Sequence, residues 1–178
     1  MPELAVSWAQ YHRTIEALAA QIYQSGWCFD QIACVAKGGL RVGDILARLF
    51  DRPLAVLAAT SYGGPGNRIR GEIALSPHLA TTAERMGPRV LLADDLSDSG
   101  TSLQASRNWL LEHYGSDIET IRTAVLWCKG DSAVLPDYYV RYLPDNPWIR
   151  QPFEPYEQMS PAELAPASPP AEQQQPQR

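Results

Sequence analysis

Residues 90–103, which read VLLADDLSDSGTSL, decide how the rest of the chain is interpreted. The run opens with four apolar residues after Gly87 and Pro88, a pattern typical of a buried parallel strand. The hydroxyl-rich turn 99–102 then leads into a helical pattern that begins at Leu103. Because free backbone N–H groups and the dipole of the helix N-terminus both face such a turn, the order strand, polar turn, helix predicts an anion site.

Three acids stand beside that predicted anion site, namely Asp94, Asp95 and Asp98. They would repel a phosphate unless a divalent cation or sugar hydroxyls lay between them. A ligand that carries a phosphate, a diol and Mg²⁺ accounts for both the acids and the turn. The alternative is an ordinary turn whose Asp and Ser side chains only cap the helix. The length of the whole string favours the ligand site.

The same residues resemble the phosphoribosyl pyrophosphate (PRPP) signature of type I phosphoribosyltransferases. That signature consists of an apolar strand, two acids, and then an acid followed by Thr or Ser, Gly, any residue, and Thr or Ser. The resemblance implies that Asp94 and Asp95 hold the ribose diol and Mg²⁺, with Asp95 as a metal ligand. It also implies that the turn binds the 5′-phosphate through Ser99, Gly100, Thr101 and Ser102.

Composition limits the classes of protein to consider. The chain has 178 residues, 45% of them hydrophobic, which is enough for one core and suggests one domain with a tail. A net charge of −5 argues against nucleic acid as a partner. The three cysteines show no C-x-x-C spacing, and no apolar run reaches membrane-spanning length. The N-terminus lacks signal-peptide features, so we expect no membrane insertion and a cytoplasmic location.

The N-terminal third of the chain alternates helical and strand patterns. Ser7 with Gln10 forms a capping-box pattern ahead of an amphipathic helix that Gly26 ends. Residues 31–36 (QIACVA) predict a short buried strand, and residues 42–50 predict the crossover helix that follows it.

The turn between this strand and helix is Lys37-Gly38-Gly39. Paired glycines let backbone amides approach an anion and Lys37 adds a positive charge, although such a tripeptide alone is often a plain turn. The run resembles the pyrophosphate-binding loop of hypoxanthine-guanine phosphoribosyltransferases, whereas bacterial xanthine-guanine enzymes carry Arg at the position of Lys37. In those relatives the peptide bond that enters the basic residue is cis, so the resemblance implies a cis Ala36–Lys37 bond.

Residues 53–59 predict a further apolar strand, and residues 63–71, with four glycines, have no periodicity. Composition alone is compatible with a flexible surface loop. In the family, a Ser-Tyr pair like Ser61-Tyr62 opens a flexible hood loop that closes over the reaction. The resemblance implies that Arg68 reaches the pyrophosphate from this loop.

Residues 118–128 predict another strand, which ends at Lys129. Taken alone, Lys129 would be a solvated lysine at a strand end. The sequence that follows it resembles the family's base-recognition region, where this lysine donates to the O6 atom of a 6-oxopurine.

Residues 148–154 (WIRQPFE) resemble the closing segment Trp-Ile-Glu-Gln-Pro-Trp-Asp of bacterial xanthine-guanine enzymes. The resemblance implies that Trp148 stacks on the purine and that the backbone carbonyl of Ile149 faces its C2 edge. Glu154 replaces the family's Asp as the second metal ligand, and Phe153 replaces a Trp. These departures leave the choice among guanine, xanthine and hypoxanthine open.

The alternating patterns predict an α/β fold, a mainly parallel twisted sheet flanked by helices on both faces. Ligands of such sheets lie outside the carboxyl ends of the strands, where Lys37, residues 94–102 and Lys129 all fall. We expect one phosphoribosyltransferase domain over residues 1–157. Residues 158–178, rich in Pro, Ala, Glu and Gln, should be disordered.

The resemblance implies transfer of the 5-phosphoribosyl group of PRPP to N9 of guanine, xanthine or hypoxanthine, which yields a nucleoside 5′-monophosphate and pyrophosphate in purine salvage. Asp98 is then the catalytic residue that manages the purine proton near N7, Lys37, Gly38 and Arg68 bind the pyrophosphate, and Mg²⁺ is the cofactor. A homo-oligomer, either a dimer or a tetramer, is expected. Two alternatives stay open: transfer to another base, and a non-catalytic PRPP-sensing regulator, which the acidic charge disfavours.

Overall fold

The computed structural model describes residues 3–61 and 73–165 of the chain. In chain order the elements are β1 (Glu3–Ala5), α1 (Trp8–Gln24), β2 (Gln31–Ala36), α2 (Gly39–Phe50), β3 (Leu54–Ser61), β4 (Ile73–Leu75), β5 (Ala80–Thr81), β6 (Arg89–Ala93), β7 (Leu96–Ser97), α3 (Thr101–Tyr114), β8 (Thr120–Lys129), β9 (Tyr138–Leu143), β10 (Trp148–Arg150), the 3-10 helix η1 (Glu154–Glu157) and α4 (Pro161–Leu164).

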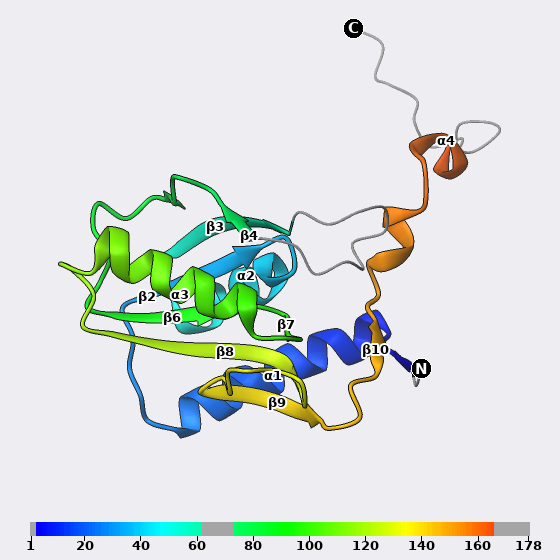
Figure 1. Ribbon diagram of the computed structural model, residues 1–178, viewed down its shortest axis with the longest axis horizontal. Helices are drawn as coiled ribbons and strands as arrows, with labels where there is room; N and C mark the ends of the chain where they lie inside the picture. The colour runs from blue at the N-terminus through cyan, green and yellow to red at the C-terminus, as the bar shows by residue number, and fades with distance from the viewer. Residues whose placement is uncertain (1–2, 62–72, 166–178) are drawn as a thin grey trace, which may run out of the picture.

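A mainly parallel sheet forms the centre of the described structure (Figure 1). Its strand order is β4-β3-β2-β6-β8-β7, with β5 paired to β3 and β9 paired to β8. The pairs β2–β3, β2–β6, β6–β8, β7–β8 and β8–β9 are parallel, whereas β4 and β5 run antiparallel to β3. The predicted α/β fold is therefore confirmed.

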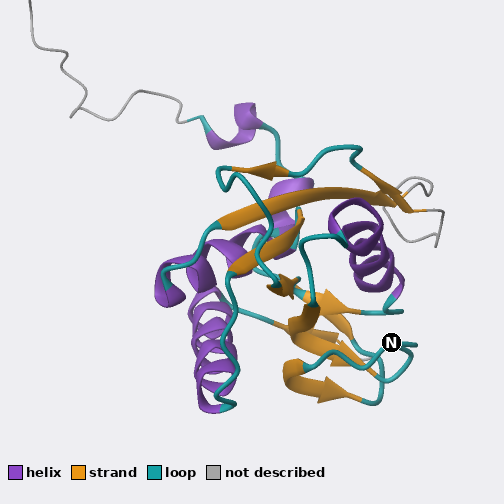
Figure 2. Cartoon of the chain, turned by 90° about the vertical axis from the view of Figure 1, so that its left-hand side faces the viewer, coloured by secondary structure: helices purple, strands orange, loops and turns teal. Residues whose placement is uncertain are grey.

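Helices cover both faces of this sheet, as Figure 2 shows. One core cluster packs α1 and α2 against side chains such as Leu91 and Ala93 of β6. The other cluster packs α3 against Val90 and Leu92 of the same strand. Because side chains of a strand alternate between its faces, one continuous apolar run supplies both cores.

The start of α1 agrees with the capping-box prediction. Gln10 N–H donates to Ser7 Oγ at 3.3 Å, and Ser7 N–H donates to Gln10 Oε1 at 2.8 Å. After the helix, Gly26 adopts φ +69°, the left-handed conformation common just beyond a helix C-terminus. The helix α2 begins three residues earlier than predicted, at Gly39 rather than residue 42, so it starts directly at the glycine pair.

The strand path that begins with β6 continues past Asp94 and Asp95. After β6 ends at Ala93, pairing with β8 resumes at β7 in the same register, with Ala93 opposite Ala124 and Leu96 opposite Trp127. The backbone carbonyl of Asp95 accepts from Leu126 N–H at 3.0 Å between these two pairs. The two acids thus sit in an interruption of one long strand path, and the turn comes only afterwards.

The N-terminal strand lies beside the closing segment at one edge of the molecule (Figure 1). The strand β1 pairs in parallel with β10, with Leu4 opposite Ile149, which brings the N-terminal residues beside the closing segment (Figure 1). Within the tail expected to be disordered, residues 161–164 form the one-turn helix α4, which Ser160 caps. Residues 166–178 lie outside the described part of the chain. No helix among the described residues has the length and apolar character to cross a membrane.

Candidate active site

A cavity of about 240 Å³ opens at the carboxyl ends of β2 and β6. It brings together many of the residues selected from the sequence. The predicted site residues that line it are Gly38, Asp94, Asp95, Asp98, Ser99, Gly100 and Ser102. Parallel α/β sheets bind ligands at this edge because the loops that follow successive strands converge there.

The turn before α3 has the geometry of an anion cradle. Gly100 occupies the N-cap position with φ +78°, and a Cβ there would lie 2.9 Å from Ser132 Oγ. Beyond it, the hydroxyls of Ser99 and Thr101 lie 2.8 Å apart. Thr101 N–H donates to Ser99 Oγ at 3.4 Å, but Gly100 has no side chain with which to cap the helix, so the next backbone N–H groups of the first turn are available to a bound anion.

Asp98 is not a helix cap, because its side chain forms an ion pair with Lys129 instead. The distance between Lys129 Nζ and Asp98 Oδ1 is 3.2 Å; the lysine side chain is 8% exposed and the aspartate side chain 52%. The alternative that the acids of this turn only cap the helix is therefore wrong for Asp98. Lys129, at the end of β8, is a buried cation directed at the rim of the cavity rather than a solvated one.

The adjacent acids Asp94 and Asp95 differ in environment. Asp94 is buried, and its Oδ1 accepts from the backbone N–H of Asp95 at 2.8 Å. Burial, and then the charge of Asp95, raise the pKa of Asp94 well above its usual range. Burial also raises the pKa of the partly exposed Asp95. Two carboxylates this close favour a bound cation, because it offsets both their desolvation and their mutual repulsion.

The donor set suits Mg²⁺ bound jointly by protein and substrate. The described residues contain no group of three or more His, Cys, Asp or Glu side chains arranged to hold a metal by themselves. Mg²⁺ usually takes one or two carboxylates and completes its shell with waters and substrate phosphate oxygens. Asp95 with a phosphorylated ligand fits that requirement.

The Lys37-Gly38-Gly39 loop faces this acid pair. The Ala36–Lys37 bond is cis, as predicted. A Cβ on Gly38 would collide with the Asp95 carboxylate, and a Cβ on Gly39 would lie 2.7 Å from the carbonyl oxygen of Ala93. Both glycines are thus required by close approach of the loop to β6, whereas the Lys37 side chain points to solvent.

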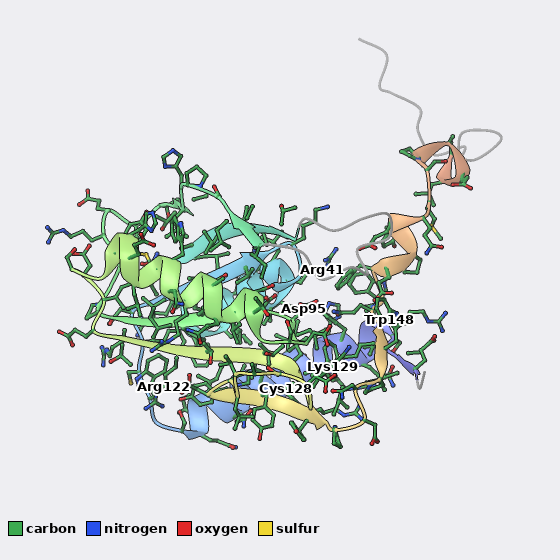
Figure 3. The ribbon with its side chains drawn as sticks, in the orientation of Figure 1. Arg41, Asp95, Arg122, Cys128, Lys129 and Trp148 are labelled. Carbon is green, nitrogen blue, oxygen red and sulfur yellow. The ribbon has the colours of Figure 1, made fainter. Side chains whose placement is uncertain are left out.

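The closing segment reaches the acid pair through a residue that sequence reasoning did not select. Gln151 follows β10, is buried, and donates from Nε2 to Asp95 Oδ2. In Figure 3 Asp95, Lys129 and Trp148 lie toward the same end of the molecule, and Arg122 lies toward the other. The only sequence sign of Gln151 is its match to the Gln in the resembling segment.

The family comparison agrees with this geometry. Residues 7–158 match the phosphoribosyl transferase domain. The chain belongs to the phosphoribosyltransferase family. As a phosphoribosyltransferase it is a glycosyltransferase enzyme, and residues of the PRPP signature line its cavity.

Two curated proteins and one solved structure show the similarity of this phosphoribosyltransferase to purine-specific relatives. The chain is similar to the xanthine-guanine phosphoribosyltransferase of Gluconobacter oxydans, at 28% identity over 151 residues, which cover 84% of this chain and 83% of that protein. It is also similar to the hypoxanthine/guanine phosphoribosyltransferase of Methanopyrus kandleri, at 29% over 104 residues, 54% of this chain and 52% of that one. The crystal structure of a purine phosphoribosyltransferase from Pyrococcus horikoshii superposes with a TM-score of 0.69 at 28% identity, covering 86% of this chain and 95% of the other.

Several predicted residues of the phosphoribosyltransferase lie outside the cavity lining. Those that the structure describes but that do not line the cavity are Lys37, Thr101, Lys129, Trp148, Ile149 and Glu154. Ile149 is buried in β10, and Trp148 is 39% exposed. Glu154 Oε1 accepts from the backbone N–H of Gln151 at 3.0 Å, so the predicted metal ligand also stabilises the turn after β10. Arg68 lies outside the described residues.

Arg41 of α2 is a second residue that the sequence did not reveal. Its guanidinium lies 4.6 Å from the ring centre of Phe153 and 5.5 Å from that of Trp8. The Phe153 ring also meets Tyr11 edge-on at 5.8 Å. These contacts hold the closing segment of the phosphoribosyltransferase on α1 and α2, beside the acid pair.

Proposed function

We propose that this phosphoribosyltransferase transfers the 5-phosphoribosyl group of PRPP to N9 of a 6-oxopurine and releases pyrophosphate, as a purine salvage enzyme. The observation that carries the proposal is the ion pair between Lys129 and Asp98 at the rim of the phosphate cradle. The 6-oxopurine guanine presents two neighbouring acceptors on one edge, O6 and N7. A lysine and a carboxylate side by side match O6 and a protonated N7.

The same pair disfavours other bases. Adenine presents an amino donor where guanine has O6, so the ammonium of Lys129 would meet a donor rather than an acceptor. A pyrimidine has no second ring and hence no N7 for Asp98 to address. The names of the relatives in Gluconobacter and Methanopyrus, which act on guanine with xanthine or hypoxanthine, support the same substrate class.

The reaction needs positioned charges more than a nucleophilic side chain. The C1′–O bond breaks and its electron pair leaves with pyrophosphate, while the N9–C1′ bond forms; a proton on N7 passes to the carboxylate of Asp98. Since C1′ carries positive charge as the bond lengthens, carboxylates near the ribose stabilise the transition state. Mg²⁺, when bound, neutralises charge on the departing pyrophosphate.

Each part of the substrates has a proposed set of contacts. Residues 99–102 bind the 5′-phosphate, and Asp94 and Asp95 hold the ribose diol, with Asp95 also a metal ligand. Lys37, Gly38 and Arg68 bind the pyrophosphate. The purine stacks on Trp148, its C2 edge faces the carbonyl of Ile149, and Glu154 is the second proposed metal ligand. The free carboxylate oxygen of Glu154, the one not bonded to Gln151, is available for that purpose.

We further propose a homo-oligomer, a dimer or a tetramer, in a reducing cytoplasm. The three cysteines, all of which lie in described segments, are unpaired there, with Cys34 and Cys128 buried. Burial raises the pKa of the Cys34 thiol to about 12, which makes it unreactive.

The test is a panel of bases with purified full-length chain, PRPP and Mg²⁺. Pyrophosphate release and nucleotide formation are measured for guanine, xanthine and hypoxanthine, with adenine and uracil as comparison bases. At least one 6-oxopurine should yield its 5′-monophosphate, and the comparison bases should yield none. Turnover confined to adenine or a pyrimidine, or none with any base, would overturn the proposal.

A further inference from the structure

Among the described residues, the side chain of Gln151 forms one hydrogen bond, and its partner is Asp95 of the acid pair. The Gln151 side chain is buried, and Nε2 donates to Oδ2 of Asp95 across 56 positions of sequence. The amide nitrogen must face the carboxylate, because an ionised carboxylate only accepts hydrogen bonds. Oε1 is buried without a hydrogen-bond partner among the described residues.

The backbone around Gln151 is itself held in place. Its N–H donates to Glu154 Oε1 at 3.0 Å, and its carbonyl oxygen accepts from Glu154 N–H at 3.2 Å. Phe153, two residues on, packs on Tyr11 and under Arg41. The Gln151 amide therefore projects from an anchored turn, and little conformational freedom is lost when it binds Asp95.

The two oxygens of Asp95 differ in their contacts. Oδ2 is bound by Gln151 and would lie 2.8 Å from a Cβ on Gly38, whereas Oδ1, which Gln151 does not bind, would lie nearer still to that Cβ. The acid thus presents its second oxygen to the Lys37-Gly38-Gly39 loop, and it lines the cavity. Gln151 does not line that cavity.

We propose that Gln151 is a positioning residue: by binding Oδ2 of Asp95 it holds Oδ1 toward the Gly38 loop, in the orientation that Mg²⁺ and PRPP require. This inference rests on the proposed function. It also links the two halves of the site, because the segment that carries Trp148 and Ile149 is the one that orients the acid at the PRPP end. A methionine in place of Gln151 has a similar length and would fill the same space without burying the unpaired oxygen Oε1. The hydrogen bond to Asp95 is therefore what the amide of Gln151 adds over an apolar side chain.

The first measurement is calorimetric binding of Mg²⁺–PRPP to the full chain without base. Gln151→Met should weaken binding about tenfold, the usual effect of losing a hydrogen bond to a charged group. The matched control is Gln158→Met, an exposed glutamine seven positions along the same segment, which should bind like the wild type. In turnover, KM for PRPP should rise by a similar factor while kcat at saturation stays within about threefold.

A double-mutant cycle tests whether Gln151 acts through Asp95. In an Asp95→Ala background, Gln151→Met should change KM for PRPP less than about twofold, because the bond is already absent. An equal tenfold loss in both backgrounds would show that Gln151 supports the site in another way and would overturn the inference. Gln151→Asn is a second variant, for use if Gln151→Met folds poorly. Its amide is too short to reach Asp95, so it should show the same loss of binding, about tenfold.

The outcomes separate this inference from the function on which it rests. If the wild type binds Mg²⁺–PRPP and Gln151→Met and Gln151→Asn bind equally well, the positioning role is wrong and the proposed function stands. If the wild type binds no Mg²⁺–PRPP, both are wrong.

Discussion

Replacing Asp98 by Asn tests the proposed chemistry most directly, because it removes a charge at one atom and keeps the shape of the side chain. Asp98 Oδ1 lies 3.2 Å from Lys129 Nζ. At that distance two unit charges attract by about 5 kcal/mol at an effective dielectric constant of about 20. That value is a ceiling, since the Asp98 side chain is 52% exposed and Asn still accepts a hydrogen bond.

We therefore expect Asp98→Asn to lower the free energy of unfolding by about 1–2 kcal/mol, because it leaves the buried Lys129 with a weaker partner. The melting temperature should fall by about 3–6 °C, which leaves the protein folded at assay temperature. Turnover should fall further, by about a hundredfold or more, because the amide accepts no proton from N7. The KM for PRPP should stay nearly unchanged.

A matched control is Asp44→Asn, which breaks an Asp–Arg48 ion pair of 3.0 Å on the exposed face of α2. Exposed pairs of this kind contribute about 0.3–0.5 kcal/mol, and this one lies away from the cavity, so stability and turnover should stay close to wild type. Steady-state kinetics with PRPP and base varied separately, together with thermal unfolding, provide the measurements. Wild-type turnover in Asp98→Asn would refute the proton-transfer role. A rise in KM for PRPP as large as the fall in turnover would place Asp98 in phosphate binding instead.

Three further changes test other parts of the structure. Gly38→Ala should raise KM for PRPP at least about tenfold, because the added Cβ collides with the Asp95 carboxylate. The control Gly26→Ala, with nothing within 4 Å of the added Cβ, should lower the free energy of unfolding by about 1 kcal/mol and leave activity unchanged. The Arg89 guanidinium lowers the pKa of Asp30 in the folded protein. The stability from this pair is therefore present above the unfolded pKa near 3.9 and is lost as pH falls through the lower folded value. In thermal unfolding, the melting temperature of Asp30→Asn should lie below that of wild type at pH 6, and the two should converge in strong acid. Ser7→Ala should lower the free energy of unfolding by about 1 kcal/mol in urea titrations, because α1 loses its capping box.

What the sequence predicts well is what neighbouring residues determine. The apolar run before Asp94 reads as a buried strand because each face of β6 meets its own helix layer. Residues 31–36 coincide with β2, since a short apolar run ahead of a glycine pair has few other stable conformations. Interruptions are harder to see. Nothing in the sequence shows that pairing with β8 resumes at Leu96, because that continuation depends on the partner strand.

Contacts between distant segments were beyond prediction for a physical reason. The strands β1 and β10 are three residues each, too short for any periodicity, and each is stable only because the other lies beside it. The bond between Gln151 and Asp95 likewise depends on how the closing segment crosses α1 and α2, where Phe153 and Arg41 meet. The family resemblance pointed to residues 148–154 but did not predict the hydrogen bond between Gln151 and Asp95.

These two kinds of determinant divide the site into parts that should respond differently to mutation. The cradle at residues 99–102 and the Gly38 loop follow the ends of two central strands, so the sheet core anchors both of them. The closing segment is attached through the Gln151–Asp95 bond, the Phe153 contacts and the short β1–β10 pairing, each of which is small. Local opening should therefore begin at the closing segment and leave the cradle intact, since regions with few buried contacts open first. It follows that base affinity should be lost first as the protein is heated toward its unfolding transition, while PRPP affinity should fall by no more than the roughly tenfold expected from losing the Gln151–Asp95 bond.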